Sequence, residues 1–253
     1  MTESNPELKI KPLSDNAKIL ICFCDGNKGG VGKSFFCRTL YHVLKTSGLS
    51  IKGLEADINS PDFAGIYGAE IEPIQFSEDE QKLDLPNAIF DIALEEKQNI
   101  VVNLPATVHE AFRRWVEAYN VISLLARNDC KLVKFFVTTG EFDSIQSLKV
   151  SLNQFPEIQH VIVKNQKYSD WDFFETEKEV QQLIQKSNSP VIELPRLPVR
   201  IASFLLQKRM SFAAALEYRG DRAAGERYGL PEREAVRSFL EKAAQHIFQS
   251  GVF

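Results

Sequence analysis

The stretch CDGNKGGVGKSFF, from Cys24 to Phe36, decides the fold of this chain. An apolar run, KILICFC (18–24), precedes its glycines, and a run with apolar residues at helical spacing (33–48) follows them. A buried strand, a glycine-rich loop and a helix in this order are typical of a phosphate-binding loop. The glycines let backbone N–H groups turn toward phosphate oxygens, and the helix adds the positive end of its dipole. The stretch therefore predicts an α/β nucleotide-binding protein.

The usual pattern of such a loop is G-x-x-x-x-G-K-[ST], and this chain carries Asn27 in the place of the first glycine. Lys33 is expected to reach the β- and γ-phosphates, and the Ser34 hydroxyl is expected to join a Mg²⁺ shell. The nucleotide-binding candidates in the loop are Asn27, Lys28, Gly29, Gly30, Val31, Gly32, Lys33, Ser34 and Phe35.

The composition limits the classes of protein to which this chain can belong. The chain has 253 residues, of which 44% are hydrophobic and 25% charged, with a formal net charge of −4. This is enough for one full core, and we expect a flexible arm over 1–16 and a single domain over 17–253. The charge argues against a basic nucleic-acid coat. No run approaches the roughly 20 apolar residues of a membrane helix, and four cysteines without zinc-ligand spacing favour reduced thiols in a cytoplasmic protein.

Short β-rich runs alternate with helical patterns along the chain, which predicts a mostly parallel twisted sheet flanked by helices on both faces. A helix is expected over 86–98 and another from Pro231 onward. Ligands of such folds bind beyond the carboxyl ends of the strands, where the loop, Asp57 and Asn103 all lie. Further strands are expected over 50–57, 99–104, 121–126, 134–139, 160–165 and 190–195.

KGGVGKS (28–34) resembles the deviant Walker A motif of the ParA/MinD family of P-loop ATPases. The resemblance implies ATP and Mg²⁺ as cofactors and a homodimer with ATP sandwiched between two copies. In that family the lysine matching Lys28 reaches the partner's ATP, so the resemblance implies a catalytic charge supplied in trans, as an arginine finger does.

LEADINSPD (54–62) resembles the first switch of that family, D-x-D-P. Its second acid matches Asp57, which by this resemblance helps to position the attacking water. A carboxylate at a strand end also suits Mg²⁺ binding through a water, so Asp57 is a candidate for both roles. Glu55 stands in the place of the first acid.

NIVVNLPATVHEAF (99–112) departs from the family, because Asn103 stands where relatives carry the Asp that holds Mg²⁺ through a water. An amide binds water but brings no negative charge. Slow hydrolysis or weaker Mg²⁺ dependence is one consequence, and a protein that does not hydrolyse nucleotide is the alternative. Replacing Asn103 by Asp is expected to raise turnover, unless the amide belongs to a hydrogen-bond network in which an acid would be unpaired.

The base side of the site is indicated by two weaker resemblances. Asn165, at the end of HVIVKN (160–165), matches the asparagine that bonds adenine, and LPRLPVRIASFLLQ (194–207), with Pro195, matches the loop that closes over the base. No N-K-x-D guanine signature is present, which favours ATP over GTP. FVTTGEFDSIQSLKVSLNQFP (136–156) resembles the TraL and StbB type of conjugation-accessory ATPases.

The leading hypothesis is an ATP-hydrolysing dimerisation switch that acts in partitioning or positioning a plasmid or other cargo, or in conjugative mobilisation. The alternative is a nucleotide-binding scaffold with little turnover that docks a protein such as a relaxase. EYRGDRAAGERY (217–228) interleaves Arg219, Arg222 and Arg227 with acids, which gives weak support for nonspecific DNA binding and nucleoid association. The terminal helix has few cations, so we expect it to pack on the core and not to enter a membrane.

Overall fold

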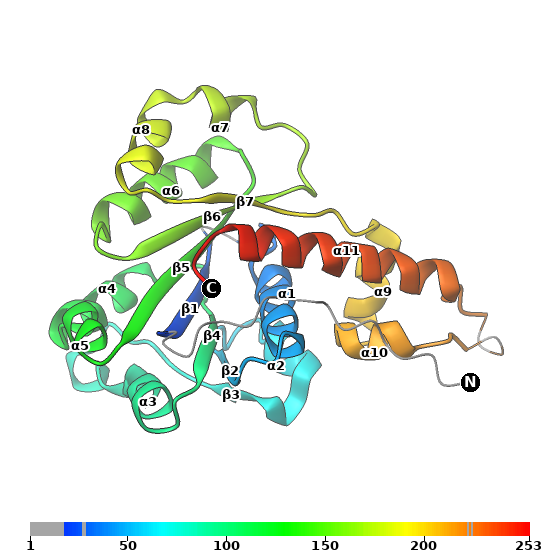
Figure 1. Cartoon of the computed structure of the whole chain (residues 1–253), viewed down its shortest axis with the longest axis horizontal. Helices are drawn as coiled ribbons and strands as arrows, with labels where there is room; N and C mark the ends of the chain where they lie inside the picture. Colours follow the sequence, from blue (N-terminus) through cyan, green and yellow to red (C-terminus); the bar gives the residue numbers. More distant parts are fainter. Residues whose placement is uncertain (1–17, 27–28, 222, 224) are drawn as a thin grey trace.

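The computed structural model describes residues 18–26, 29–221, 223 and 225–253. The arm expected over 1–16 lies outside these residues. The described strands form one seven-stranded sheet in which every neighbouring pair is parallel, in the order β3-β2-β4-β1-β5-β6-β7 (Figure 1). The fold class expected from the sequence is confirmed. The strands are β1 (Ile19–Asp25), β2 (Ile51–Glu55), β3 (Ile71–Pro73), β4 (Asn99–Asn103), β5 (Cys130–Thr138), β6 (Gln159–Asn165) and β7 (Val191–Leu194).

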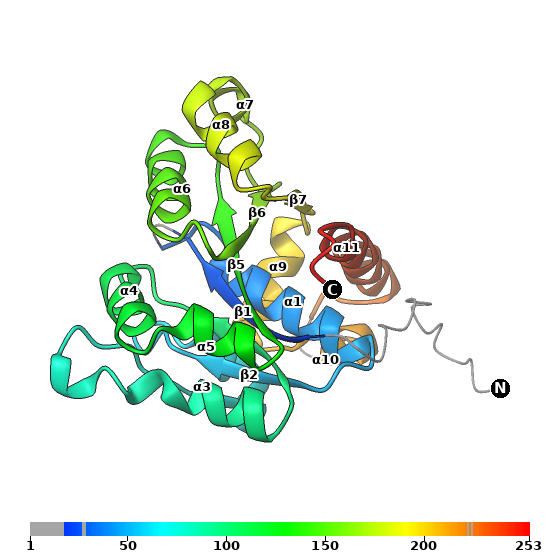
Figure 2. The same ribbon diagram turned by 60° about the vertical axis from the view of Figure 1, so that its left-hand side comes forward.

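Helices cover both faces of the sheet (Figure 2). The hydrophobic clusters divide them between the faces, because alternate residues of each strand point to opposite sides. One face carries α1 (Lys33–Thr46), α2 (Asp62–Tyr67), α9 (Val199–Gln207), α10 (Phe212–Glu217) and α11 (Leu230–Gln249). The other carries α3 (Ala88–Phe90), α4 (His109–Ala118), α5 (Val121–Arg127), α6 (Phe142–Gln154), α7 (Asp172–Thr176) and α8 (Lys178–Lys186).

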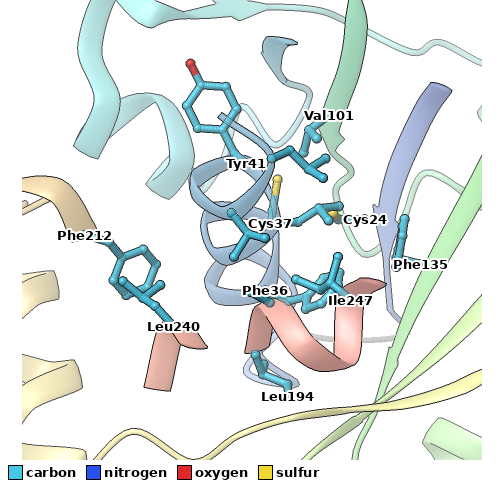
Figure 3. Packing of buried hydrophobic residues seen from close by; sticks show 14 of the residues in the cluster. Cys24, Phe36, Cys37, Tyr41, Val101, Phe135, Leu194, Phe212, Leu240 and Ile247 are labelled. Carbon is cyan, nitrogen blue, oxygen red and sulfur yellow. The ribbon is translucent and has the colours of Figure 1, made fainter. Parts of the chain in front are cut away.

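Helix α1 fixes the phosphate loop in place because its apolar face is buried between the sheet and α11 (Figure 3). Phe36 and Leu40 are almost fully buried there, and Cys37 lies against Cys24 of β1. The four cysteines are free and buried, as expected for reduced thiols. The loop therefore joins two elements that are both anchored in the core.

Helix α11 belongs to the same core. Val236, Phe239, Leu240, Ala243 and Ile247 are buried against the sheet and α10, so the packing role expected for the terminal helix is confirmed. Among the described residues, no helix has both the length and the apolar character to cross a membrane.

One expectation about local structure was wrong, a second held only in part, and one strand was missed. Residues 121–126 form helix α5 and not a strand, since only Val121 and Leu125, one helical turn apart, are buried in it. The helix expected over 86–98 is present but irregular and shorter: a 3-10 turn, the short α3 and a π-helical turn at Asp91–Glu95 follow one another without a gap. The edge strand β3 was not anticipated, because three residues give no recognisable pattern.

Candidate functional site

The phosphate loop, the ends of β2, β4 and β6 and the segment after β7 meet at the carboxyl edge of the sheet. They enclose a cavity of about 390 Å³. Val31 lies beside the cavity in the core, and Asn103 is buried behind Ser34. Asn27 and Lys28 lie outside the described residues. The residues expected from the sequence that line the cavity are Gly29, Gly30, Gly32, Lys33, Ser34, Phe35, Asp57, Asn165 and Pro195.

The loop adopts a conformation that only glycine accepts easily. Gly30 and Gly32 have φ angles of 88° and 98°, in the left-handed region. A Cβ atom on Gly32 would lie 2.3 Å from Nδ2 of Asn165, so a side chain is also excluded by contact. Glycine is therefore required at position 32 for two independent reasons.

The end of β6 and the segment that follows it hold the loop by its carbonyl groups. Asn165 Nδ2 donates to the Val31 carbonyl at 2.7 Å, and the Tyr168 hydroxyl donates to the Gly30 carbonyl at 3.0 Å. Because these bonds engage loop carbonyls, the loop N–H groups stay available to an anion, as in other phosphate nests. Tyr168 was not anticipated from the sequence, because a tyrosine three residues beyond a strand carries no signal.

Asn165 also accepts a hydrogen bond at Oδ1 from the backbone N–H of Lys167, at 3.0 Å. Both atoms of its amide are thus engaged within the protein. Its expected contact with adenine stays a prediction, which would draw on the second lone pair of Oδ1.

Lys33 is buried, with 6% of its surface exposed, and its Nζ lies 3.8 Å from Oδ2 of Asp57. The charge of Asp57 thus compensates the buried ammonium group. Phosphate oxygens would offer the same compensation at closer range, so this ion pair can open when an anion enters the cavity.

Arg38 lines the cavity one turn after Ser34, and its Nε donates to the Ser34 carbonyl at 3.3 Å. It was not anticipated, although its place on the same face of α1 as Ser34 is readable from helical spacing. The cavity thus contains a second buried cation beside Lys33.

Glu55 and Asn103 form the oxygen-rich wall behind Ser34. Asn103 Nδ2 donates to Glu55 Oε1 at 2.8 Å and lies 3.4 Å from Ser34 Oγ. Burial raises the pKa of the Glu55 carboxyl, and hydrogen bonds from Asn103 and three backbone N–H groups oppose the rise. Asn103 is therefore part of a hydrogen-bond network. This favours the interpretation that the amide is needed at this position over the interpretation that an acid has been lost.

The residues present fit a hydrated Mg²⁺ ion. The Ser34 hydroxyl and the Asp57 carboxylate line the cavity, and the buried Oδ1 of Asn103 has no hydrogen-bond partner among the described residues. Within the described part of the chain, no three His, Cys, Asp or Glu side chains gather as a metal site of their own. Mg²⁺ is typically held by one or two protein groups, waters and substrate phosphates, so such a cluster is not required.

Comparisons with known proteins agree with this architecture. No family model matches the chain. Its sequence is 26% identical over 196 residues to Protein MobD of Acidithiobacillus ferrooxidans, which covers 76% of this chain and 84% of that protein.

Its structure is similar to a chain of the MinC:MinD cell division protein complex of Aquifex aeolicus, with a TM-score of 0.54 and 13% identity over 91% of this chain and 96% of the other. A complex of a Cyanothece McdA variant with ATP gives a TM-score of 0.47 at 10% identity, over 92% and 96% of the two chains. With a glycine-rich phosphate loop at the carboxyl edge of its parallel sheet, the chain resembles the ParA/MinD group of P-loop ATPases and has their fold.

Proposed function

We propose that the chain is an ATP-binding and ATP-hydrolysing switch of the ParA/MinD type, which acts in positioning or partitioning a plasmid or other cargo, or in conjugative mobilisation. The observation that carries the proposal is the cavity at the phosphate loop, which is lined by Lys33, Ser34 and the carboxylate of Asp57. This arrangement offers cations to phosphates and oxygens to a hydrated Mg²⁺ ion.

The ion pair between Lys33 and Asp57 suggests how binding starts the switch. Triphosphate oxygens would replace Asp57 as the partner of Lys33, because they would bind where the loop N–H groups converge. Asp57 would then be released to orient a water, either the attacking one or one of the Mg²⁺ shell. The segment over 54–62, which resembles the first switch of the family, would then respond to the nucleotide bound in the cavity.

Nucleotide binding and turnover test the proposal. Lys33→Ala should weaken ATP binding by about a hundredfold or more and abolish hydrolysis, since it removes the charge that faces the phosphates. Lys45→Ala is the matched control, because Lys45 lies on the same helix, is exposed and pairs with Glu70 far from the cavity. Equal ATP affinity in the two variants would contradict the proposal.

Dimerisation is the second part of the switch. By the resemblance, Lys28 acts on the nucleotide of a second copy, so Lys28→Ala should leave ATP binding largely intact and remove ATP-dependent dimerisation or hydrolysis. Sedimentation with and without ATP measures this. A variant that dimerises and turns over normally would contradict the role in trans.

A nucleotide-binding scaffold that docks a cargo adaptor or relaxase is the second candidate, and Asn103 favours it, because the amide replaces a carboxylate on the metal side. Single-turnover hydrolysis on saturated protein separates the two. Release of phosphate within the assay supports the switch, and bound ATP that remains intact supports the scaffold. In either case we propose a cytoplasmic protein, associated with the nucleoid if it binds DNA.

A further inference from the structure

Arg38 is a buried cation in the wall of the cavity at the phosphate loop. Only 6% of its surface is exposed, and it lines the cavity. Its Nε donates to the Ser34 carbonyl at 3.3 Å, and its Cζ lies 5.4 Å from the centroid of the Phe35 ring. Side chains of a helix lean toward its N-terminus, so these contacts hold the guanidinium group beside the first turn of α1.

The charge of Arg38 has no counter-ion among the described residues. The other buried side chains of Lys or Arg in this part of the chain, Lys33 and Lys134, lie 3.8 and 2.9 Å from a carboxylate oxygen. Arg38 forms no ion pair with any residue that the structure describes, and its Nη atoms form no hydrogen bond with them. Burial lowers the pKa of Arg38 in spite of nearby Tyr67 and Asp62, as expected for a poorly compensated cation. Because a guanidinium group stays protonated in proteins, the position calls for an anion.

The cavity itself indicates which anion that is. Lys33, Ser34 and the loop N–H groups are expected to bind the β- and γ-phosphates and their Mg²⁺. The segment after β7 gives the cavity an apolar part, which suits the base, through Leu197, Val199, Ala202 and Leu206. The sugar and the base carry no charge. The α-phosphate, which joins the sugar to the other phosphates, is therefore the anion that remains for Arg38.

We propose that Arg38 binds the α-phosphate of the nucleotide, in ADP and ATP alike. It would thus set an affinity common to both nucleotide states, whereas groups that meet the γ-phosphate distinguish them. The Phe35 ring beside it packs on Phe212 and Phe239, with centroids 5.8 and 5.4 Å apart, so the guanidinium group is held in place before a nucleotide binds. The inference rests on the proposed nucleotide-binding function.

Calorimetry with ADP and with the non-hydrolysable ATP analogue AMP-PNP tests the inference. Arg38→Met keeps most of the side-chain length without the charge. It should weaken the binding of both nucleotides by about twentyfold, because a charge-assisted contact to phosphate is lost, and the two factors should agree to within about twofold. Arg38→Lys keeps the charge without the planar fork and should lose less affinity than Arg38→Met.

Arg127→Met is the matched control. The Nε of Arg127 donates to the carbonyl of Ser123, four residues earlier, at 3.1 Å, which repeats the local contact of Arg38 with Ser34. Arg127 is exposed and belongs to α5, which packs on the other face of the sheet from α1. The affinity of Arg127→Met for both nucleotides should equal that of wild type.

Thermal denaturation separates binding of a phosphate from a structural role. Without nucleotide, the Tm of Arg38→Met should be unchanged or higher than that of wild type, because the variant removes a buried charge without a counter-ion. The rise in Tm on adding ADP should be smaller than in wild type. A lower Tm without nucleotide, combined with a full rise on adding ADP, would show that Arg38 is structural and would overturn the inference.

The calorimetric outcomes also separate this inference from the proposed function. If Arg38→Met binds ADP as tightly as wild type does, this inference alone fails. A loss of affinity confined to AMP-PNP would overturn it too, because it would assign Arg38 to the γ-phosphate. If the wild-type chain binds neither nucleotide, the proposed function fails as well.

Discussion

At the scale of single residues, Tyr168 holds the phosphate loop through one hydrogen bond to Gly30. Tyr168→Phe removes only the hydroxyl, so the loop should lose part of its preorganisation. A neutral hydrogen bond contributes about 1 kcal/mol, and we expect the dissociation constant of ATP to rise about fivefold. Tyr119→Phe is the matched control, since Tyr119 is partly exposed and lies at the end of α4, away from the cavity. Unchanged affinity in Tyr168→Phe would contradict this role.

His160 links the stability of the fold to pH. Its ring nitrogens contact the Ile158 carbonyl at 2.9 Å and the Ser151 hydroxyl at 3.0 Å. Burial, with a smaller contribution from Lys134, lowers the pKa of His160 to about 4. Between pH 6.5 and 4 the unfolded chain therefore binds a proton that the folded chain does not, and the free energy of unfolding falls as pH falls.

The contribution of His160 to that fall is on the order of 3 kcal/mol by pH 4. His42, whose pKa burial also lowers to about 4, adds to it in the same direction. Urea unfolding at pH 7 and pH 4.5 measures the slope, and His160→Gln should make it shallower. His246→Gln in α11 serves as control. If the slope is the same in all three proteins, His160 is not the group responsible.

At the scale of elements, a buried ion pair joins β1 and β5 directly beneath the phosphate loop. Lys134 Nζ lies 2.9 Å from Asp25 Oδ2, and the rings of Phe112 and Phe155 lie within 5.0 and 4.4 Å of the same nitrogen. The other oxygen of Asp25 accepts the N–H of Gly26 at 2.7 Å. The pair thus fixes the residue from which the loop departs.

Lys134→Met should destabilise the fold by about 3–5 kcal/mol, because it leaves the Asp25 charge buried and unpaired. In the wild-type chain burial favours the neutral acid, but the charge and hydrogen bond of Lys134 and the Gly26 N–H together lower the pKa of Asp25. Asp25 therefore stabilises the fold above its ordinary pKa near 4, and this stability is lost as pH falls through the folded value.

Without Lys134, burial would raise the pKa of Asp25, and its protonation would relieve the unpaired charge. The deficit of Lys134→Met relative to wild type should then shrink as pH falls from 7 toward 5, as measured by urea unfolding. The double variant Lys134→Met/Asp25→Asn should recover much of the lost stability at pH 7. A deficit that does not change with pH, together with no recovery in the double variant, would show that packing and not charge is what Lys134 provides.

At the scale of the whole molecule, basic residues are concentrated in one part of an acidic chain. The net charge is −4, yet residues 196–237 contain nine Lys and Arg against five Asp and Glu. This segment includes α9, α10 and the start of α11, which Figure 1 shows extending to one side of the sheet. Arg209 and Arg219 are exposed and have no ion-pair partner among the described residues.

Any DNA binding should therefore depend on ATP, because a dimer aligns two such patches while a monomer repels a polyanion. Each phosphate contact contributes about −0.9 to the slope of log affinity against log salt. Arg209→Glu/Arg219→Glu should abolish retention on DNA, and Lys178→Glu/Lys186→Glu on the distant α8 should not. Equal retention with and without ATP would contradict the prediction, and no retention under any condition would favour the protein-docking scaffold.

The sequence alone determined the phosphate loop, the parallel sheet and the edge at which the site lies. These follow from local signals: glycines that permit a left-handed turn at Gly30 and Gly32, apolar runs that only a buried strand accommodates, and the rule that binding residues follow strand ends. For the apolar run at 121–126 the same reasoning predicted a strand, which was wrong. Its pattern fits a strand or a helix, and packing on β5 selected the helix.

The tertiary structure alone decided how the site residues meet. Glu55 and Asn103 lie 48 residues apart in the chain and become contacts only through the register of β2 on β4. Tyr168 and Gly30 are separated by 138 residues and meet because β6 ends beside the loop. Such contacts leave no periodic trace in the sequence, because the distance between two side chains depends on the packing of every element between them. For this reason Asn103 looks like a missing acid in the sequence and is the hydrogen-bonded partner of one in the fold.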